Sequence, residues 1–347
     1  MFLQNHWYAV AWDHEIGAKP IARTICGEPI VFFRRPDRSV VALEDVCPHR
    51  LAPLSQGQVK DGNLVCGYHG LAFNGEGRCV HMPNQQGVMA GLDVRAYPIA
   101  ERYRFVWVWI GAAEKADERL LPDLPYCESP DWTFDGDTFH VACDYRLLVD
   151  NLMDLTHEAY VHPTSIGQEE LSETPIETVS DDTSVTVSRW MRNVTPPPFW
   201  AANLKSTEPC DRWQICRFTL PAHVMIDVGV ALAGTGAPEG DRSQGVTGIV
   251  FDVMTPETET TTWYHWGMAR NFEIDDRGLT GRIREAQAQV FREDIAVLEG
   301  QQANIGRLPE RYLANFNIDE GGVRARRLIR KALAAQEAEN AAPVAAE

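Results

Sequence analysis

Two short runs near the start of the chain combine cysteine with histidine, and they restrict its fold more strongly than any other feature. Cys47-Pro48-His49 has the order Cys-x-His, and Cys66-Gly67-Tyr68-His69 has the order Cys-x-x-His. Structural zinc modules usually show paired Cys-x-x-Cys halves or two cysteines followed by two histidines, and these runs fit neither. Turn-forming residues such as Pro53 and Gly70 follow each cysteine. The spacing therefore predicts two adjacent loops that present two thiolates and two imidazoles.

This donor set is typical of a Rieske [2Fe–2S] cluster, in which cysteines hold one iron and histidines hold the other. Neutral histidines put less negative charge on their iron, so such a cluster passes single electrons at a higher potential than an all-cysteine cluster. The predicted ligands are Cys47, His49, Cys66 and His69. The other cysteines have no partner at metal-ligand spacing, and we interpret them as buried or half-buried thiols: Cys26, Cys79, Cys127, Cys143, Cys210 and Cys216.

Length and charge restrict the class of protein. A chain of 347 residues exceeds the size at which one hydrophobic core is usual, so we expect two domains. The formal net charge of −17 argues against nucleic acid as a partner, because phosphate binding needs a positive surface. Neither a signal peptide at Met1–Trp12 nor a membrane span of about 20 apolar residues is visible. Scattered cysteines are typical of a reducing compartment, and we expect a cytoplasmic protein.

The first part of the chain shows short strands broken by turns. Three runs are rich in the β-branched and aromatic residues that favour strands: Pro29–Phe33, Ser39–Leu43 and Phe105–Ile110. Charged and proline-bounded residues at 111–125 mark a boundary. We therefore predict an all-β domain over residues 1–115, with both cysteine loops at one end, and a second domain over residues 116–347.

The second domain combines strands with helices. Helices are expected over residues 144–162, 279–302 and 319–335. The strands expected between them cover residues 184–191, 213–220, 223–231, 248–254 and 261–268. This order predicts an α+β fold in which helices grip an antiparallel sheet. The tail from about residue 336 is rich in alanine and glutamate and is expected to fray.

A polar stripe marks the helix expected over residues 144–162. At about 100° per residue, four polar side chains fall in one sector of an otherwise apolar helix: Asp150, Asn151, Asp154 and His157. Such a stripe is unfavourable to bury unless its members are paired or bind metal. His157 and His162 are therefore candidate metal ligands, and a satisfied structural pair is the alternative.

The spacing of these histidines differs from that of a zinc-protease helix. His157-Glu158 resembles the start of His-Glu-x-x-His, but the second histidine comes one residue late. Ideal i,i+5 residues diverge by about 140°, so both reach one ion only where the helix distorts or ends. Pro163 directly follows His162 and disfavours continuation of the helix. The pair therefore favours a ligand at a helix end over the protease motif.

A third ligand is expected from a carboxylate, because two histidines and one carboxylate form the facial triad of non-haem Fe(II) oxygenases. In the helix expected over residues 279–302, Asp294 lies near the centre of an apolar stripe, Glu293 lies at its edge and Glu299 lies well off it. The stripe consists of Ile283, Ala286, Val290, Val297 and Leu298. A carboxylate on a buried face needs a cation, so Asp294 is the predicted ligand. A salt bridge to Arg292 or another base is the alternative.

With these residues in place, the chain resembles the oxygenase components of Rieske non-haem iron aromatic-ring oxygenases over nearly its full length. The runs that carry the resemblance are residues 5–8, 47–53, 63–71, 143–146, 150–162, 197–200, 212–218 and 266–272. The resemblance implies an N-terminal Rieske domain, a C-terminal helix-grip domain with a mononuclear Fe(II), and a head-to-tail homotrimer in which electrons cross between subunits. Asp154 matches the acid expected to link His157 to a Rieske histidine, His69, of the next subunit. Asn151 matches a polar residue close to the iron.

Within this family the chain is most similar to the O-demethylases. The resemblance implies that O₂ is the co-substrate and that a separate flavin and ferredoxin-type reductase passes electrons from NADH, because the chain has no glycine-rich dinucleotide turn. The implied reaction O-demethylates a methoxylated aromatic acid, and vanillate would give protocatechuate, formaldehyde and water. One alternative is demethylation or hydroxylation of another aromatic acid. A different class, a Rieske electron carrier, needs only about 100 residues.

An aromatic acid as substrate needs ring surface and a partner for its carboxylate. The candidate wall residues are Phe199, Trp200, Trp213 and Phe218, and the candidate partners of the anion are Arg217, His223, His265 and Arg270. Strand alternation puts Trp213 and Arg217 on one face, so we expect them to act together. The alternative is that the aromatic residues are ordinary core.

Overall fold

Residues 1–163, 174–311 and 313–341 are described by the structure, which is a computed structural model. Contacts between residues divide the chain into two units. Unit 1 consists of Met1–Leu121 with Thr255–Thr258, and unit 2 consists of Pro122–Met254 with Glu259–Glu347. Unit 1 therefore continues beyond residue 115 and includes the end of a strand that begins in unit 2.

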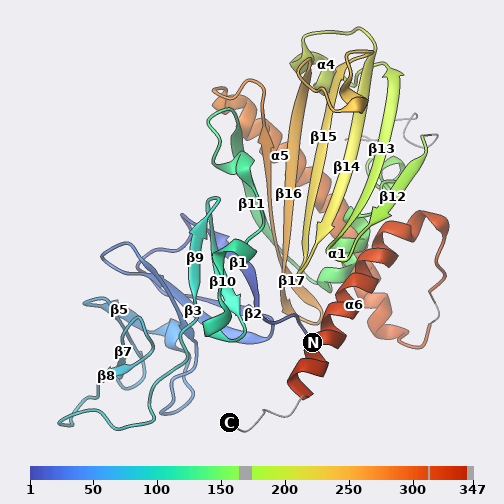
Figure 1. Ribbon diagram of the computed structural model, residues 1–347. Coiled ribbons are helices and arrows are strands. Elements are labelled where there is room, and N and C mark those ends of the chain that lie inside the picture. The colour runs from blue at the N-terminus through green and yellow to red at the C-terminus, as the bar shows by residue number, and fades with distance from the viewer. Residues whose placement is uncertain (164–173, 312, 342–347) are drawn as a thin grey trace. The chain divides into compact units, whose positions relative to one another are not determined.

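Unit 1 consists of three antiparallel sheets, which confirms the all-β fold predicted for the N-terminal part of the chain (Figure 1). The first sheet has the order β1-β10-β9, with β1 at His6–Trp12, β10 at Phe105–Ile110 and β9 at Ile99–Arg102. The second is β2-β3-β4, at Ile21–Ile25, Glu28–Arg34 and Val40–Glu44. The third is β5-β6-β7-β8, at Gln58–Lys60, Asn63–Val65, Ala72–Phe73 and Cys79–His81.

Strand ends position both cysteine loops of unit 1. Cys47 lies shortly after β4, and Cys66 directly follows β6. Both thiols belong to one buried apolar cluster with residues of β3, β4, β6 and β7: Val31, Phe33, Leu43, Leu64 and Phe73. Each loop is therefore held by a buried cysteine at its base.

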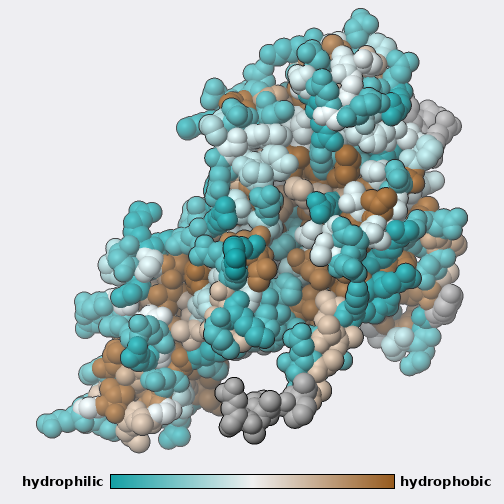
Figure 2. All heavy atoms as spheres, viewed as in Figure 1, coloured by the Kyte–Doolittle hydropathy of each residue, from teal (hydrophilic) through white to brown (hydrophobic). Residues whose placement is uncertain are grey.

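The surface of unit 1 carries apolar side chains near these loops. Apolar spheres gather around β7 and β8 in Figure 2. The large hydrophobic residues exposed in this part of the chain are Leu51, Tyr68, Val80, Val88 and Met89. In the single chain, this end of unit 1 thus presents apolar side chains to solvent.

Unit 2 is built on one seven-stranded sheet with the order β11-β17-β16-β15-β14-β13-β12. The strands are β11 Thr133–Val141, β12 Ile176–Ser180, β13 Ser184–Val194, β14 Cys210–Thr219, β15 His223–Leu232, β16 Gly245–Thr258 and β17 Thr261–Arg270. Neighbours pair antiparallel from β12 through to β16, and β11 pairs antiparallel with β17. The predicted α+β fold with an antiparallel sheet is confirmed.

One face of this sheet packs against a long helix, α5, at Arg277–Arg307 (Figure 1). Tyr264 and Trp266 of β17 both contact the ring of Phe291 in α5, with ring centroids 5.2 Å apart. We call this the inner face. Alternation and strand register extend the inner face across the sheet to Asp252, Val224, Ile226, Val228, Gln214 and Arg189.

The helix expected over residues 144–162 is divided into α1 at Tyr145–Leu152 and α2 at Glu158–Val161. The Asp154 carboxylate accepts hydrogen bonds from the amide and hydroxyl of Thr156, at 2.7 and 2.6 Å. Asp and Thr side chains compete in this way with helical backbone bonding, so the helix stops and restarts. Both histidines lie after this break, His157 at the start of α2 and His162 directly after its end, where the backbone is no longer helical.

Among the described residues of unit 2, two strands and one helix have no counterpart in the sequence prediction. β11 contains polar residues and Gly136, where a Cβ would lie 1.9 Å from the carbonyl oxygen of Trp266. β12 is an edge strand that is mostly exposed, so it lacks an apolar pattern. α4 at Pro198–Leu204 follows a proline run. These elements depend on their neighbours more than on local propensity.

The last helix, α6 at Glu320–Ala341, continues past the residue at which fraying is expected to begin. The remainder of that tail, residues 342–347, lies outside the described residues. Among the helices that the structure describes, none is long and apolar enough to cross a membrane.

Candidate metal centres

The two cysteine loops of unit 1 have the same backbone hydrogen-bond pattern. In loop 47–52 the amide of Cys47 donates to the carbonyl of Ala52 at 2.9 Å, and the amide of Leu51 donates to the carbonyl of Cys47 at 2.8 Å. In loop 66–71 the corresponding bonds join the amide of Cys66 to the carbonyl of Leu71 at 2.8 Å and the amide of Gly70 to the carbonyl of Cys66 at 3.0 Å. The fifth residues, Leu51 and Gly70, both have a left-handed φ, of 57° and 76°. Two unrelated stretches of sequence thus form matching loops.

The side chains of these loops form a buried pair below an exposed pair. Cys47 and Cys66 are each 2% exposed, and their thiols are close enough for each to affect the other electrostatically. His49 and His69 are exposed, with ring centroids 4.6 Å apart. Burial raises the pKa of the Cys47 thiol, and the neighbouring Cys66 adds to this rise. Because two adjacent buried thiolates need positive charge, this donor set fits a [2Fe–2S] cluster held by two cysteines and two histidines.

A second donor set lies in unit 2, where the structure brings together His157, His162 and Asp294. Their potential ligand atoms all lie within 4.8 Å of one another. The Nε2 atoms of His157 and His162 lie 3.3 and 3.1 Å from the same oxygen, Oδ1 of Asp294. The set combines two histidines and one carboxylate, the donor types of a mononuclear non-haem iron site.

The other ring nitrogen of each histidine is already engaged. Nδ1 of His157 lies 2.6 Å from the backbone carbonyl oxygen of Asp154. Nδ1 of His162 lies 2.7 Å from Oε2 of Glu293. Metal-binding histidines are typically oriented by such a partner, which leaves Nε2 for the ion. The residues present therefore fit a divalent metal held by two Nε2 atoms and Asp294.

The charge at this cluster favours a cation. Burial would raise the pKa of Asp294, but its hydrogen bonds to the two imidazoles and their charge lower it to about 2. Burial would lower the pKa of His157 and His162, but the hydrogen bond and charge of Asp294 raise both above the ordinary value. A buried carboxylate that holds positive charge in this way suits a metal ion.

The apolar stripe expected around Asp294 is only partly present. Val297 is 53% exposed and Ala286 is exposed, whereas Ile283, Val290 and Leu298 are buried. Phe291, which the stripe did not include, contacts β17 and sets the face that α5 turns inward. Arg292 lies over the ring of Phe139, with its guanidinium carbon 5.7 Å from the ring centroid.

Two of the three other polar residues of the expected stripe, Asn151 and Asp154, also lie at this cluster, whereas Asp150 pairs with Arg326 at 2.9 Å. Asn151 donates from Nδ2 to Oδ1 of Asp294 at 3.0 Å. The carboxylate of Asp154 caps Thr156, and its Oδ2 lies 4.0 Å from Nδ1 of His157. Asp154 therefore reaches His157 in this chain through its backbone carbonyl. Its link to another subunit's Rieske histidine stays a prediction.

A buried polar network anchors α2 to the inner face of the sheet. Both carboxylate oxygens of Glu158 accept from Nε2 of Gln214 at 2.9 Å, and Oε2 lies 3.4 Å from Nη2 of Arg189. Nε of Arg189 donates to Oε1 of Gln214 at 3.0 Å. The sequence reasoning missed this network, because its members come from three separate elements with no shared spacing. It holds the residue directly after His157.

Most residues predicted to bind substrate do not join the metal cluster. Trp213 and Arg217 lie on the outer face of the sheet, where Trp213 Nε1 donates to Oδ1 of Asp227 at 2.7 Å. His223 and His265 share that outer face. Arg270 donates to the backbone carbonyls of Phe272, Glu273 and Asp276. Their roles in substrate binding stay predictions.

The remaining wall candidates lie closer to the inner face. Phe218 points to it by strand register. Trp200 of α4 lies over Gly248, where a Cβ would meet the Trp200 ring at 3.7 Å. Phe199 and Trp200 pack edge to face, with ring centroids 5.1 Å apart.

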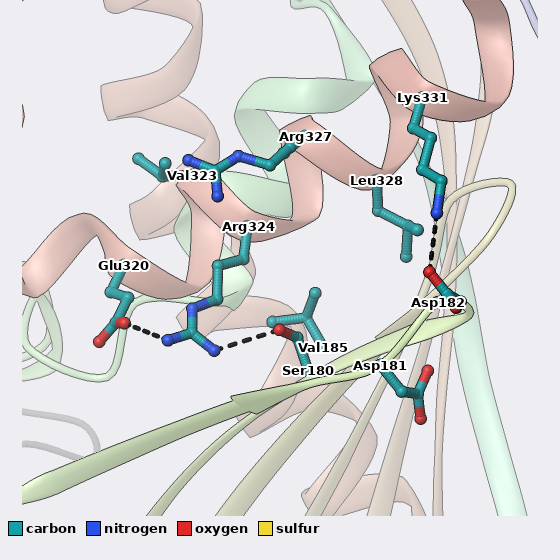
Figure 3. A pocket seen from close by; sticks show the side chains of 10 residues that line it. All are labelled: Ser180, Asp181, Asp182, Val185, Glu320, Val323, Arg324, Arg327, Leu328 and Lys331. Carbon is teal, nitrogen blue, oxygen red and sulfur yellow. Dashed lines mark hydrogen bonds and ion pairs between the residues drawn. The ribbon is translucent and has the colours of Figure 1, made fainter.

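A surface hollow between α6 and the β12–β13 turn is lined by charged side chains (Figure 3). Arg324 pairs with Glu320 and Ser180, and Lys331 pairs with Asp182. None of the predicted site residues lines this hollow. It contains neither histidine nor cysteine, so it does not resemble either donor set.

Family comparisons agree with both donor sets. Residues 6–98 match the Rieske [2Fe-2S] domain, and residues 141–335 match the vanillate O-demethylase oxygenase C-terminal domain. The chain is 50% identical to the vanillate O-demethylase oxygenase subunit of Pseudomonas sp. strain HR199, over 99% of each protein.

Solved structures agree with the fold. A crystal structure of dicamba monooxygenase bound to 3,6-dichlorosalicylic acid has a TM-score of 0.91 and 36% sequence identity, over 97% of this chain and 99% of that chain. A crystal structure of dicamba monooxygenase with non-heme iron and dicamba has a TM-score of 0.85 and 34% identity over the same shares.

Proposed function

Because this chain belongs to the family of vanillate O-demethylase oxygenase subunits, with a Rieske domain at its N-terminal side, we propose that it O-demethylates a methoxylated aromatic acid. The proposed substrate is vanillate. The proposed reaction consumes O₂, two electrons and two protons, and it converts the aryl methoxy group to a phenol, formaldehyde and water. The observation that carries the proposal is the cluster of His157, His162 and Asp294 within 4.8 Å of one another.

The chain's two donor sets support a division of roles. In the proposal, residues 1–115 hold a Rieske cluster through Cys47, His49, Cys66 and His69, and residues 116–347 hold the mononuclear iron. When bound, the cluster supplies single electrons and the iron supplies activation of O₂. A Rieske carrier would need only the first set, so the second set favours an oxygenase.

The protein's own residues prepare the iron site. Glu293 and the carbonyl of Asp154 hold the Nδ1 atoms of the two histidines, so each Nε2 faces Asp294. Asn151 holds Oδ1 of Asp294. These contacts keep the donors in place before metal and substrate bind, which favours rapid and specific loading.

Several partners and properties are part of the proposal. The oxygenase role implies a flavin and ferredoxin-type reductase that supplies electrons from NADH. We also propose the homotrimer, the cytoplasmic location and the contact of Asp154 with His69 of a neighbouring subunit. Sedimentation of the iron-loaded protein tests the trimer, and a monomer with full turnover would exclude electron transfer between subunits.

The function is tested with the iron-loaded full chain, a surrogate reductase and NADH, against a panel of methoxybenzoates. We expect release of formaldehyde together with a phenolic product, and the largest kcat/KM for vanillate. Asp294→Asn is the control without the carboxylate ligand, and it should release no formaldehyde. Hydroxylation of an arene without any formaldehyde would refute the demethylase but keep the oxygenase. Reduction of the cluster without any product would favour the electron carrier.

A further inference from the structure

Asp252 of β16 is a fully buried carboxyl group with only one oxygen paired. Tyr264 donates its hydroxyl proton to Oδ1 of Asp252 at 2.7 Å. The other oxygen, Oδ2, is buried and has no hydrogen-bond partner among the described residues. Such a group is rare in a native interior and is expected to have a function or an unrecorded partner. Nothing in the metal site accounts for it.

Asp252 lies on the inner face near the proposed iron site. The ring of its partner Tyr264 contacts Phe291, which lies one helical turn before Asp294 in α5. Burial raises the pKa of Asp252 to about 8, and the charge of Asp294 adds to this rise. Near neutral pH the carboxyl group is therefore mostly protonated. Since Oδ1 accepts from Tyr264, the proton belongs on Oδ2, which can then both donate and accept a hydrogen bond.

Partly exposed apolar side chains lie near Asp252 on the inner face. Ile226 and Val228 of β15 share this face, and β15 is flanked by β14 and β16, so these side chains are reached only from the helix side. Both are only partly buried, although they lie in the middle of the sheet. Val224, the direct neighbour of Asp252, and Ile226 are consecutive on this face. Gly248, opposite Val228, adds no side chain. The β15 side chains near Asp252 are thus apolar, and the nearest polar side chain across from Val228 is that of Gln214.

We propose that Oδ2 of Asp252 binds a hydroxyl group on the ring of the aromatic substrate, and that Asp252 thereby selects hydroxylated methoxyarenes. This inference rests on the proposed demethylase function. Vanillate, 4-hydroxy-3-methoxybenzoate, carries its hydroxyl on the carbon next to the methoxy-bearing carbon. A ring placed with its methoxy group toward Asp294 and the two histidines can therefore direct its hydroxyl to a second group nearby.

A hydroxyl suits this position better than the carboxylate of the substrate. A phenolic hydroxyl can both donate and accept a hydrogen bond. This matches Oδ2 of a protonated Asp252, because Oδ1 already accepts from Tyr264. A substrate carboxylate would approach two acidic residues, Asp252 and Asp294, and would be repelled wherever either is ionised. The apolar side chains of Ile226 and Val228 offer surface to the ring itself. A buried water bound to Oδ2 is the rival explanation.

The test compares variants in the full-length, iron-loaded protein without reductase, so that binding is measured without turnover. The double variant Asp252→Leu/Tyr264→Phe removes both partners of the hydrogen bond, which limits the loss of stability. Asp252→Asn keeps a polar group of similar shape. The matched control is Asp182→Asn, an exposed aspartate in the β12–β13 turn. Iron content and the visible spectrum of the cluster show that each variant is intact.

Calorimetry gives the dissociation constant for three compounds: 4-hydroxy-3-methoxybenzoate, 3-methoxybenzoate without the hydroxyl, and 4-hydroxy-3-methoxybenzaldehyde without the carboxylate. We expect the double variant to weaken binding of both hydroxylated compounds by about tenfold or more. Binding of 3-methoxybenzoate should change by less than about twofold. Asp252→Asn should recover part of the loss, and the control should resemble the wild type. In a separate assay with reductase and NADH, the kcat/KM for the hydroxylated acid should fall in parallel.

Three results would overturn the inference. Equal weakening of all three compounds in an intact variant would mean that Asp252 supports the fold through a buried water. Unchanged binding would mean that Oδ2 does not reach the substrate. Weakening of both acids but not of the aldehyde would mean that Asp252 recognises the carboxylate. If the wild type bound none of the compounds and released no formaldehyde, the proposed function would fail together with the inference.

Discussion

Nδ1 of His162 lies 2.7 Å from Oε2 of Glu293, the residue directly before Asp294 in α5. Adjacent carboxylates on one helix therefore have different contacts. Asp294 faces both Nε2 atoms, whereas Glu293 holds the far side of one imidazole. The sequence placed Glu293 at the edge of the apolar stripe without a role. Because Glu293 contacts His162, a proposed ligand, its effect on metal binding can be tested by substitution.

We expect Glu293→Gln to weaken iron binding at the mononuclear site by about 10- to 100-fold, because a charged acceptor on Nδ1 fixes the orientation of His162 and raises its basicity. Competition with an iron chelator measures the change. Glu285→Gln, at an exposed position of the same helix, is the control. Equal iron affinity in the two variants would show that Glu293 does not support the site.

The two donor sets should be separable by mutation, since they lie in different units. We expect Asp294→Asn to lose mononuclear iron and turnover while the visible spectrum of the cluster remains. Cys66→Ser should lose that spectrum, because a thiolate ligand is removed. Iron and sulfide content per chain measures both. Loss of both the mononuclear iron and the cluster in Asp294→Asn, with the protein folded, would contradict separate sites.

The buried network around Glu158 should contribute to stability. Glu158→Ala removes the carboxylate next to the buried Arg189, and breaking such a pair costs about 3–5 kcal/mol. Because α2 is anchored by this contact, we also expect weaker iron binding through His157. Chemical denaturation measures the free energy of unfolding, with the exposed Glu177→Ala as control. A loss no larger than that of the control would show that the network is not stabilising.

Asp150 should make stability depend on pH. Burial raises its pKa to about 7, although the ion pair with Arg326 at 2.9 Å acts in the opposite direction. The unfolded value is about 3.9, so between these values the folded state binds more protons. Stability from this group is complete below about pH 4 and is lost as the pH rises through about 7.

The melting temperatures of the wild type and Asp150→Asn test this dependence. We expect the wild type to lose stability relative to the variant between about pH 5 and pH 8, because the amide side chain of the variant stays neutral throughout this range. The contributions of other titrating groups are the same in both proteins, so they cancel in the difference between the two melting temperatures. A difference that did not change with pH would refute the shift, and one of opposite sign would mean that the ion pair with Arg326 dominates.

Local patterns in the sequence predicted much of the candidate metal site. The alternation of cysteine and histidine indicated two adjacent loops, and the late histidine at position 162 indicated a ligand at a helix end, which agrees with the end of α2 at Val161. The break between α1 and α2 was not predicted. The helical wheel selected Asp294, which the structure brings to both histidines. It failed at Ala286 and Val297, which are exposed, because Phe291 sets the inward face of α5.

The sequence by itself determined the α+β fold and the strands with strong apolar patterns, and it predicted the candidate donor residues, because these follow from backbone geometry over a few residues. Tertiary structure alone decided that Trp213 and Arg217 face away from α5, that Glu293 holds His162, and that Tyr264 pairs with Asp252. Such contacts join residues far apart in the chain, and their separations have no period to detect. They exist only once the sheet and the helices have packed.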